Sequence, residues 1–256
     1  MCTAVIRFEP DAEWPVLLAF VRDEDRTRAW DHPEQWWSEH PTLIGGRDER
    51  HGGTWLALDV DPERAQVACI LNRLDPDAPT LDPEVRLTRG RIPIDVVVRG
   101  EFTPEAWDLT RYDPFNLVHA SRTTATFWRW DGAALTGDVI SAGTHIVSSH
   151  GIDQLEASDR QRDWLPRFEA AIAPDPGADG GTNDAWDSWT TLLDGRSAQV
   201  DDPSAIVIAG VAQHPNFGTV SASLVAIARD GHVRYDFNPT PDLDPDAWRR
   251  VDTSLN

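Results

Sequence analysis

Lysine is absent from this chain of 256 residues, and all 23 basic residues are arginine. Without a lysine amine, the chain excludes the P-loop of nucleotide-binding proteins, the Schiff base of pyridoxal phosphate enzymes, the kinase lysine and the Ser-x-x-Lys acyl enzymes. Cysteine is scarce as well. The two cysteines, Cys2 and Cys69, are too few for a disulfide framework.

Metal-binding patterns and long apolar runs are also missing. The sequence contains no His-Glu-x-x-His motif, cysteine cluster or Gly-x-Ser-x-Gly motif, which argues against a metallohydrolase and a classical serine hydrolase. No apolar run approaches the ~18–20 residues of a membrane span, and the start of the chain does not resemble a signal peptide. We therefore expect a cytoplasmic protein without a cofactor, a metal ion or an inserted membrane segment.

Acidic residues outnumber basic ones by 43 to 23, which gives a formal net charge of −20. This charge argues against nucleic acid and anionic membranes as partners. Hydrophobic residues make up 40% of the chain, and the 12 tryptophans favour a folded globule over a disordered chain. Because no linker of distinct composition is visible, we expect a single domain over residues 1–256, with an acidic, proline-rich tail from about residue 239.

Cys2 is the residue with the clearest chemical potential. Once Met1 is removed, Cys2 carries both a thiol and a free α-amine. The amine titrates at roughly 7.7–8.0 and can accept the thiol proton, which makes a nucleophile and its base within one residue. The apolar run at residues 3–6 predicts a strand that anchors Cys2 at the strand's edge. The alternative is a chance Met-Cys start on a mobile terminus.

Two further groups of polar residues follow predicted strands. Arg22 and Asp23 come directly after the apolar run at residues 15–21, where they form either a solvated turn or part of a site beside Cys2. In such a site Arg22 favours the thiolate, and Asp23 orients the α-amine or Arg22. Asn72 ends another predicted strand, where its side-chain amide is either an oxyanion-hole donor or an ordinary turn former.

The order of elements predicts an α+β fold of two stacked antiparallel sheets with helices outside. Strands are expected at residues 3–8, 15–21, 54–60, 65–71, 115–120, 125–130, 134–140, 144–149, 206–211, 221–229 and 232–238. Helices are expected at residues 104–109, 158–173 and 185–193, and residues 89–100 fit either a helix or a strand. Residues 31–42 and 45–53 are expected to be irregular and rich in turns.

Several short motifs together resemble the NRDE family, also named after transport and Golgi organisation protein 2. They span most of the chain. They are Met1-Cys2, Val21-Arg22-Asp23-Glu24, Gly52-Gly53-Thr54-Trp55-Leu56, Leu71-Asn72-Arg73, Arg89-Gly90-Arg91, Phe115-Asn116-Leu117 and Phe217-Gly218-Thr219-Val220-Ser221. Val21 stands where the family has asparagine, and Ser149 stands where relatives tend to have asparagine.

The resemblance implies a four-layer αββα sandwich like that of N-terminal nucleophile hydrolases such as penicillin V acylase and bile-salt hydrolase. It implies Cys2 as the nucleophile, Arg22 and Asp23 close by, and Asn72 as an oxyanion donor. By the same resemblance, the substrate-binding residues are Trp55, Asn116 and Ser149.

Two functions from different classes are consistent with these features. The first is an enzyme that cleaves or transfers an acyl group at a linear amide or related bond of a small, partly apolar substrate. The second is a non-catalytic protein that binds or traffics haem or another apolar ligand, since the family's eukaryotic members are linked to haem trafficking. The chain has eight histidines, but no spacing marks an axial ligand. A catalytically silent scaffold is a third possibility, and the oligomeric state is left open.

Overall fold

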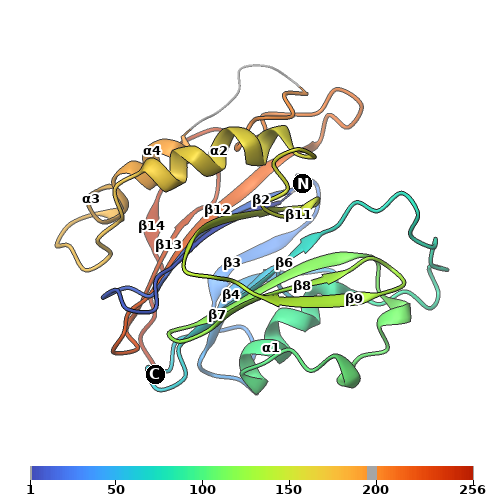
Figure 1. The fold of residues 1–256 in the computed structure, drawn as a ribbon, viewed down its shortest axis with the longest axis horizontal. Coiled ribbons are helices and arrows are strands. Elements are labelled where there is room, and N and C mark those ends of the chain that lie inside the picture. Colours follow the sequence, from blue (N-terminus) through green and yellow to red (C-terminus); the bar gives the residue numbers. More distant parts are fainter. Residues whose placement is uncertain (1, 195–200, 256) are drawn as a thin grey trace.

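The computed structural model describes residues 2–194 and 201–255, and over these residues the chain forms two seven-stranded antiparallel sheets stacked face to face (Figure 1). In spatial order, the first sheet contains β11 (Gly151–Ile152), β10 (Gly143–Ser148), β1 (Thr3–Phe8), β2 (Val16–Asp25), β12 (Phe217–Ile227), β13 (Val233–Asn238) and β14 (Arg249–Arg250). The second contains β3 (Trp30–Glu34), β4 (Leu43–Asp48), β5 (Leu56–Asp59), β6 (Gln66–Asn72), β7 (Phe115–Ser121), β8 (Ala125–Trp130) and β9 (Leu135–Val139).

Helices cover the outer face of each sheet (Figure 1). The first sheet is covered by α2 (Asp159–Ala170), α3 (Thr182–Trp186) and α4 (Ser188–Leu193), and the second by α1 (Ile92–Arg99). Short 3-10 helices occur at η1 (Arg89–Arg91), η2 (Pro104–Ala106) and η3 (Leu109–Arg111). Within the described ranges, no helix is both long enough and apolar enough to cross a bilayer.

The alternation of side chains along each strand builds three apolar layers. On β1, Ala4 and Ile6 face the core between the sheets, whereas Val5 faces the helices of the first sheet. On β6, Cys69 and its inward neighbours join the same central core, and Ile70 joins the cluster beneath α1. The predicted four-layer αββα sandwich of the α+β class is therefore confirmed.

The expectation of an irregular, turn-rich segment at residues 31–53 is wrong in part, because β3 and β4 lie within it. The glycines that suggested turns sit in the interior of β4. A Cβ atom on Gly45 would lie 2.4 Å from the carbonyl oxygen of Leu56, and one on Gly46 would lie 2.3 Å from the Trp55 ring. These glycines therefore admit close neighbours to a strand rather than reverse the chain.

Two other expectations about strands fail for reasons of long-range pairing. The strand at residues 143–148 does not continue the meander of the second sheet, because β10 pairs with β1 in the first sheet. The apolar run at residues 206–211 forms no strand. Its residues Ile206 and Val207 are instead buried in the cluster beneath α2 and α4.

The helix expected at residues 185–193 is split into α3 and α4 at Asp187, which has a φ of 39°.

His119 on β7 gives the fold a specific sensitivity to acid. The imidazole is 5% exposed, and its Nε2 lies 2.9 Å from Oε1 of Gln66. Burial lowers the pKa of His119 to about 4, whereas an unfolded chain has an ordinary histidine pKa of about 6.5. Because the unfolded state takes up the proton first, the stability associated with neutral His119 is present above pH ~6.5 and is lost as the pH falls toward 4.

We expect His119→Gln to reduce this acid sensitivity. Between pH 7.5 and 5.0 the free energy of unfolding of the unmodified protein should fall by about 2 kcal/mol more than that of the variant. Urea denaturation at the two pH values measures the difference. An identical pH dependence of the two proteins would show that His119 does not carry the effect.

Candidate active site

Cys2 lies beside Arg22 at the end of the first sheet. The register pairs Thr3 with Val21, so the next position along β1 brings Cys2 next to Arg22. The Cys2 thiol donates to the carbonyl oxygen of Asp23 at 3.6 Å, and the half-buried side chain packs against the core between the sheets.

The surroundings of the thiol favour its neutral form. Burial raises the pKa of Cys2, and the nearby Arg22 charge opposes this shift with a smaller effect. Arg22 alone therefore does not make a stable thiolate. Formation of a thiolate at Cys2 would require a base that takes the thiol proton.

Arg22 is a buried cation in the interior of β2, so the possibility of a solvated turn at residues 22–23 is wrong. Its side chain is 5% exposed, and its nearest carboxylate in the described chain, that of Glu24, is 3.9 Å away. The guanidinium carbon lies 3.8 Å from the ring centre of Trp55 and 5.6 Å from that of Trp30. Nη1 is buried and has no hydrogen-bond partner among the described residues. Burial lowers the pKa of Arg22.

The carboxylate of Asp23 points to the opposite face of β2, toward α2. It accepts from Nη1 of Arg160 at 3.1 Å and from Oγ1 of Thr219 at 2.6 Å. Arg160 also donates to Oγ1 of Thr3 at 2.7 Å. Through Arg160, the Asp23 carboxylate therefore ties the ends of β1 and β2 to α2. No ion pair between Asp23 and Arg22 occurs among the described residues.

Arg160 was not identified from the sequence, although a signal existed. It lies in the first turn of α2, where a cation opposes the helix dipole. A basic residue retained on the buried side at this position indicates a specific acidic partner, which the structure identifies as Asp23.

Ser221 on β12 completes the surroundings of Arg22. A β-bulge at Val220 shifts the register so that Thr219 pairs with Asp23 and Ser221 pairs with Arg22. Ser221 is fully buried, and its Oγ has no hydrogen-bond partner among the described residues. Sequence reasoning noted the motif that ends at Ser221 but assigned it no role.

Three buried groups that can donate hydrogen bonds therefore lie together at Arg22, which neighbours Cys2 on the next strand. We call Arg22 Nη1, Trp55 Nε1 and Ser221 Oγ the donor cluster. All three atoms lack a partner in the part of the chain that the structure describes. Buried polar groups are normally paired, and unpaired ones point to a missing partner. Each atom of the donor cluster can donate to an acceptor such as a carbonyl or carboxylate oxygen.

Two of the predicted substrate-binding residues join the sheets near Cys2. Asn116 on β7 is fully buried and donates from Nδ2 to the carbonyl oxygen of Ser148 at 2.8 Å, while its Oδ1 has no described partner. Ser149 is also fully buried. It lies two residues beyond the Ala4–Val147 pair, which places it opposite Cys2 across β1 and β10.

Asn72 does not belong to this group. It pairs with Phe115, and Phe115 lies in the cluster that faces α1. Facing residues of an antiparallel pair share one side of the sheet, so this exposed side chain lies on the outer face, away from Cys2. The prediction that the side-chain amide of Asn72 donates to an oxyanion at this site is therefore wrong.

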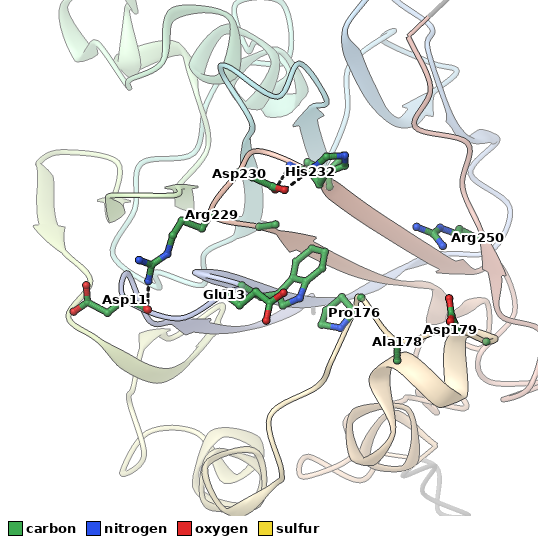
Figure 2. Close-up of a pocket in the computed structure, with 14 residues that line it drawn as sticks. Asp11, Glu13, Pro176, Ala178, Asp179, Arg229, Asp230, His232 and Arg250 are labelled. Atoms are coloured by element: carbon green, nitrogen blue, oxygen red, sulfur yellow. Dashed lines mark hydrogen bonds and ion pairs between the residues drawn. The ribbon is translucent and has the colours of Figure 1, made fainter.

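A cavity away from Cys2 lies at the other end of the first sheet (Figure 2). It measures about 890 Å³ and is lined by residues of the β1–β2 and β12–β13 turns, among them Trp14 and Asp230. Arg229 reaches the backbone of Asp11 at one side, and His232 pairs with Asp230 at 3.0 Å. At ~3.3 Å per strand residue, the length of β1 separates this cavity from Cys2 by roughly 20–30 Å.

The fold and this site define an α+β sandwich with a half-buried cysteine at the end of an interior strand. The model of the Transport and Golgi organisation 2 family matches residues 1–236. The chain therefore belongs to the Transport and Golgi organisation 2 family. No group of three or more side chains suited to hold a metal ion occurs in the described ranges.

A human relative supports this assignment. The Transport and Golgi organization protein 2 homolog of Homo sapiens is 23% identical, and the alignment covers 97% of this chain and 96% of that protein. Among solved structures, Anbu (ancestral beta-subunit) from Yersinia bercovieri is 10% identical and covers 100% of this chain and 88% of that chain. Its TM-score of 0.35 is too low to define a common fold.

Proposed function

We propose that the protein is an N-terminal cysteine amidohydrolase or acyltransferase that acts on a linear amide or related acyl bond. The observation that carries this proposal is the donor cluster beside the Cys2 thiol. A transition state with a negative oxygen supplies the acceptor that the cluster lacks, and donors fixed in a buried site stabilise such an oxygen without rearrangement. The four-layer sandwich is the architecture that the family resemblance connects with this chemistry.

The reaction begins after Met1 has been removed. The Cys2 α-amine takes the thiol proton, and Sγ attacks the substrate carbonyl carbon. The carbonyl oxygen becomes an oxyanion and accepts hydrogen bonds from the donor cluster. As the carbon–nitrogen bond breaks, the ammonium form of the terminus returns the proton to the leaving amine. The resulting thioester is attacked by water, or by an acceptor amine in a transferase, and the thiol is released.

We expect Arg22 to contribute to catalysis but not to the stability of the fold. We expect Arg22→Met to lower kcat about 100- to 1,000-fold, because an oxyanion donor is lost. Replacing a buried cation whose nearest described carboxylate is 3.9 Å away should leave the free energy of unfolding unchanged or raise it by about 1 kcal/mol. Turnover of acyl p-nitroanilides and urea denaturation measure the two quantities.

Arg160→Met is the matched control for this test. Arg160 is equally buried but forms an ion pair with Asp23 at 3.1 Å. Its loss leaves a buried carboxylate short of a partner and should lower the free energy of unfolding by about 3 kcal/mol. If Arg22→Met instead destabilises the fold as strongly and retains turnover, Arg22 is structural and the proposal fails.

Binding of an apolar ligand is the second candidate function, because one specific cavity favours it. This cavity of about 510 Å³ lies at the amino end of α2, and its lining is mainly apolar. His150 and His214 both line it, together with Val211 and Phe217. A haem ligated there would shift the Soret band on titration, and His150→Ala with His214→Ala would abolish the shift. An unchanged spectrum of the unmodified protein would exclude haem.

A further inference from the structure

Two of the glycine-containing motifs noted in the sequence meet in space, near the candidate site. The amide of Thr54 donates to the carbonyl oxygen of Gly90 at 2.8 Å. A Cβ atom on Gly53 would lie 2.6 Å from the carbonyl carbon of Gly90, so the two backbones pack directly on each other. This contact fixes the position of Arg89. The Arg89 side chain then donates from Nη1 to the carbonyl oxygen of Pro114 at 2.7 Å.

Arg89 lines a cavity with a charge opposite to that of the protein. The cavity measures about 430 Å³, and its charged lining consists of Arg28, Arg50, Arg86, Arg89 and one carboxylate, Asp113. We call it the arginine pocket. The whole chain has a formal net charge of −20. A concentration of four guanidinium groups is therefore a strong local exception in an acidic protein.

The acidic neighbours of the arginine pocket leave part of its positive charge unpaired. Arg28 pairs with Asp48, and Arg86 pairs with Asp113 at 3.3 Å. Arg28 also lies 3.9 Å from Glu24. For Arg50 and Arg89, no ion pair with a carboxylate occurs among the described residues. Planar guanidinium forks of this kind match the oxygen pairs of carboxylates and phosphates.

The arginine pocket adjoins the candidate active site. Arg28, which lines the pocket, lies 3.9 Å from Oε2 of Glu24, and the same oxygen lies 3.9 Å from Nη2 of Arg22. Trp55, which stacks on Arg22, follows Thr54 and so belongs to the segment that packs on Gly90, the neighbour of Arg89. Glu24 thus lies between the arginine pocket and the donor cluster.

We propose that the arginine pocket binds a carboxylate or phosphate group of the substrate while the acyl bond lies at Cys2. This inference rests on the proposed function for the location of the reacting bond, but the binding site itself does not depend on catalysis. The substrate is accordingly an anionic compound, with its negative group placed several atoms away from the scissile carbonyl. Neutral acyl compounds of the same length lack the contact with Arg50, Arg86 and Arg89.

Direct binding tests the pocket separately from any reaction. Inorganic pyrophosphate and succinate are titrated in turn into the full-length protein at low ionic strength, with isothermal titration calorimetry as the readout. Saturable binding of one of them is expected, and the anion that binds tighter distinguishes phosphate from carboxylate recognition. The double variant Arg50→Gln/Arg86→Gln should weaken the Kd about tenfold or more, since two charged contacts are lost.

Arg99→Gln is the matched control. Arg99 is 48% exposed and pairs with Asp95 on α1, much as Arg86 is 51% exposed and pairs with Asp113. Its Kd should match that of the unmodified protein. Absence of saturable binding for both anions, or equal binding by the double variant, overturns the inference.

A second measurement links the pocket to Cys2. Glutaryl p-nitroanilide carries a terminal carboxylate, and pentanoyl p-nitroanilide has the same carbon chain without it. We expect kcat/KM to favour the glutaryl compound about tenfold, and the double variant to lose this preference. Equal kcat/KM values in the unmodified protein would contradict the link. If Cys2→Ala and unmodified protein bind the anion equally while neither anilide is cleaved, the proposed function fails and the anion site stands.

Discussion

Cys2→Ala is expected to abolish turnover of every amide substrate, by at least about 1,000-fold, while the protein remains folded. Cys2 supplies both the attacking sulfur and, through its own amine, the base of the proposed mechanism. The side chain is half-buried and makes one long hydrogen bond, so its removal disturbs little packing. Turnover of acyl p-nitroanilides, a thermal melt and circular dichroism measure the effects together.

Cys69→Ala is the control for this experiment, because Cys69 is the second of the two cysteines. It is fully buried in β6, and burial raises the pKa of its thiol far above the physiological range. We expect normal kcat and a loss of about 1 kcal/mol in the free energy of unfolding from lost packing. Iodoacetamide should label the native protein at Cys2 alone. Unchanged turnover in Cys2→Ala would rule out the proposed mechanism.

The largest effect on stability is expected for Asp236→Ala. Asp236 and Arg234 on β13 form a buried ion pair with an Oδ2–Nε distance of 2.6 Å. The same carboxylate accepts from Nε1 of Trp186 at 2.8 Å and from Oγ1 of Thr182 at 2.6 Å, and it thereby holds α3 on the first sheet. Alanine leaves Arg234 charged, buried and without this partner. The free energy of unfolding should fall by about 3–5 kcal/mol.

Urea denaturation of Asp236→Ala and of Asp159→Ala provides the comparison. Asp159 pairs with Arg162, and both side chains are about half exposed. Because water screens such a pair, its loss should change the free energy of unfolding by less than about 1 kcal/mol. A loss of similar size for the two variants would mean that the buried pair is not the main tie between α3 and the sheet.

The sequence was sufficient for features that depend on local patterns. The alternation of apolar residues in β1 and the hairpins β5–β6 and β12–β13 are encoded by neighbouring residues, and these elements were predicted correctly. Cys2 and Arg22 were also brought together correctly, because both flank short apolar strands at the start of the chain. The pairing of β1 with β2 needs only the short connection between them.

Features that depend on distant pairing were not predictable in the same way. Ser221 reaches Arg22 through the register between β12 and β2, which joins segments about two hundred residues apart in the chain. Asn72 was placed in the site because it ends a strand, but only its pairing with Phe115 shows which side of the sheet it faces. The transfer of β10 to the first sheet likewise depends on β1 rather than on its own sequence.

Because of the bulge at Val220, the arrangement of the site depends on one extra residue in β12. Side chains two residues apart on a regular strand face the same way, whereas the extra residue sends Thr219 to Asp23 on one face and Ser221 to Arg22 on the other. Deleting one residue here would restore a regular ladder of hydrogen bonds. Either the Thr219 hydroxyl would then turn away from Asp23, or the Ser221 hydroxyl would turn away from Arg22. Homologues that are one residue shorter in this strand would thus share the fold but lack either the hydrogen bond from Thr219 to Asp23 or the Ser221 donor. A single insertion or deletion here would therefore change the chemistry of a family member more than most substitutions.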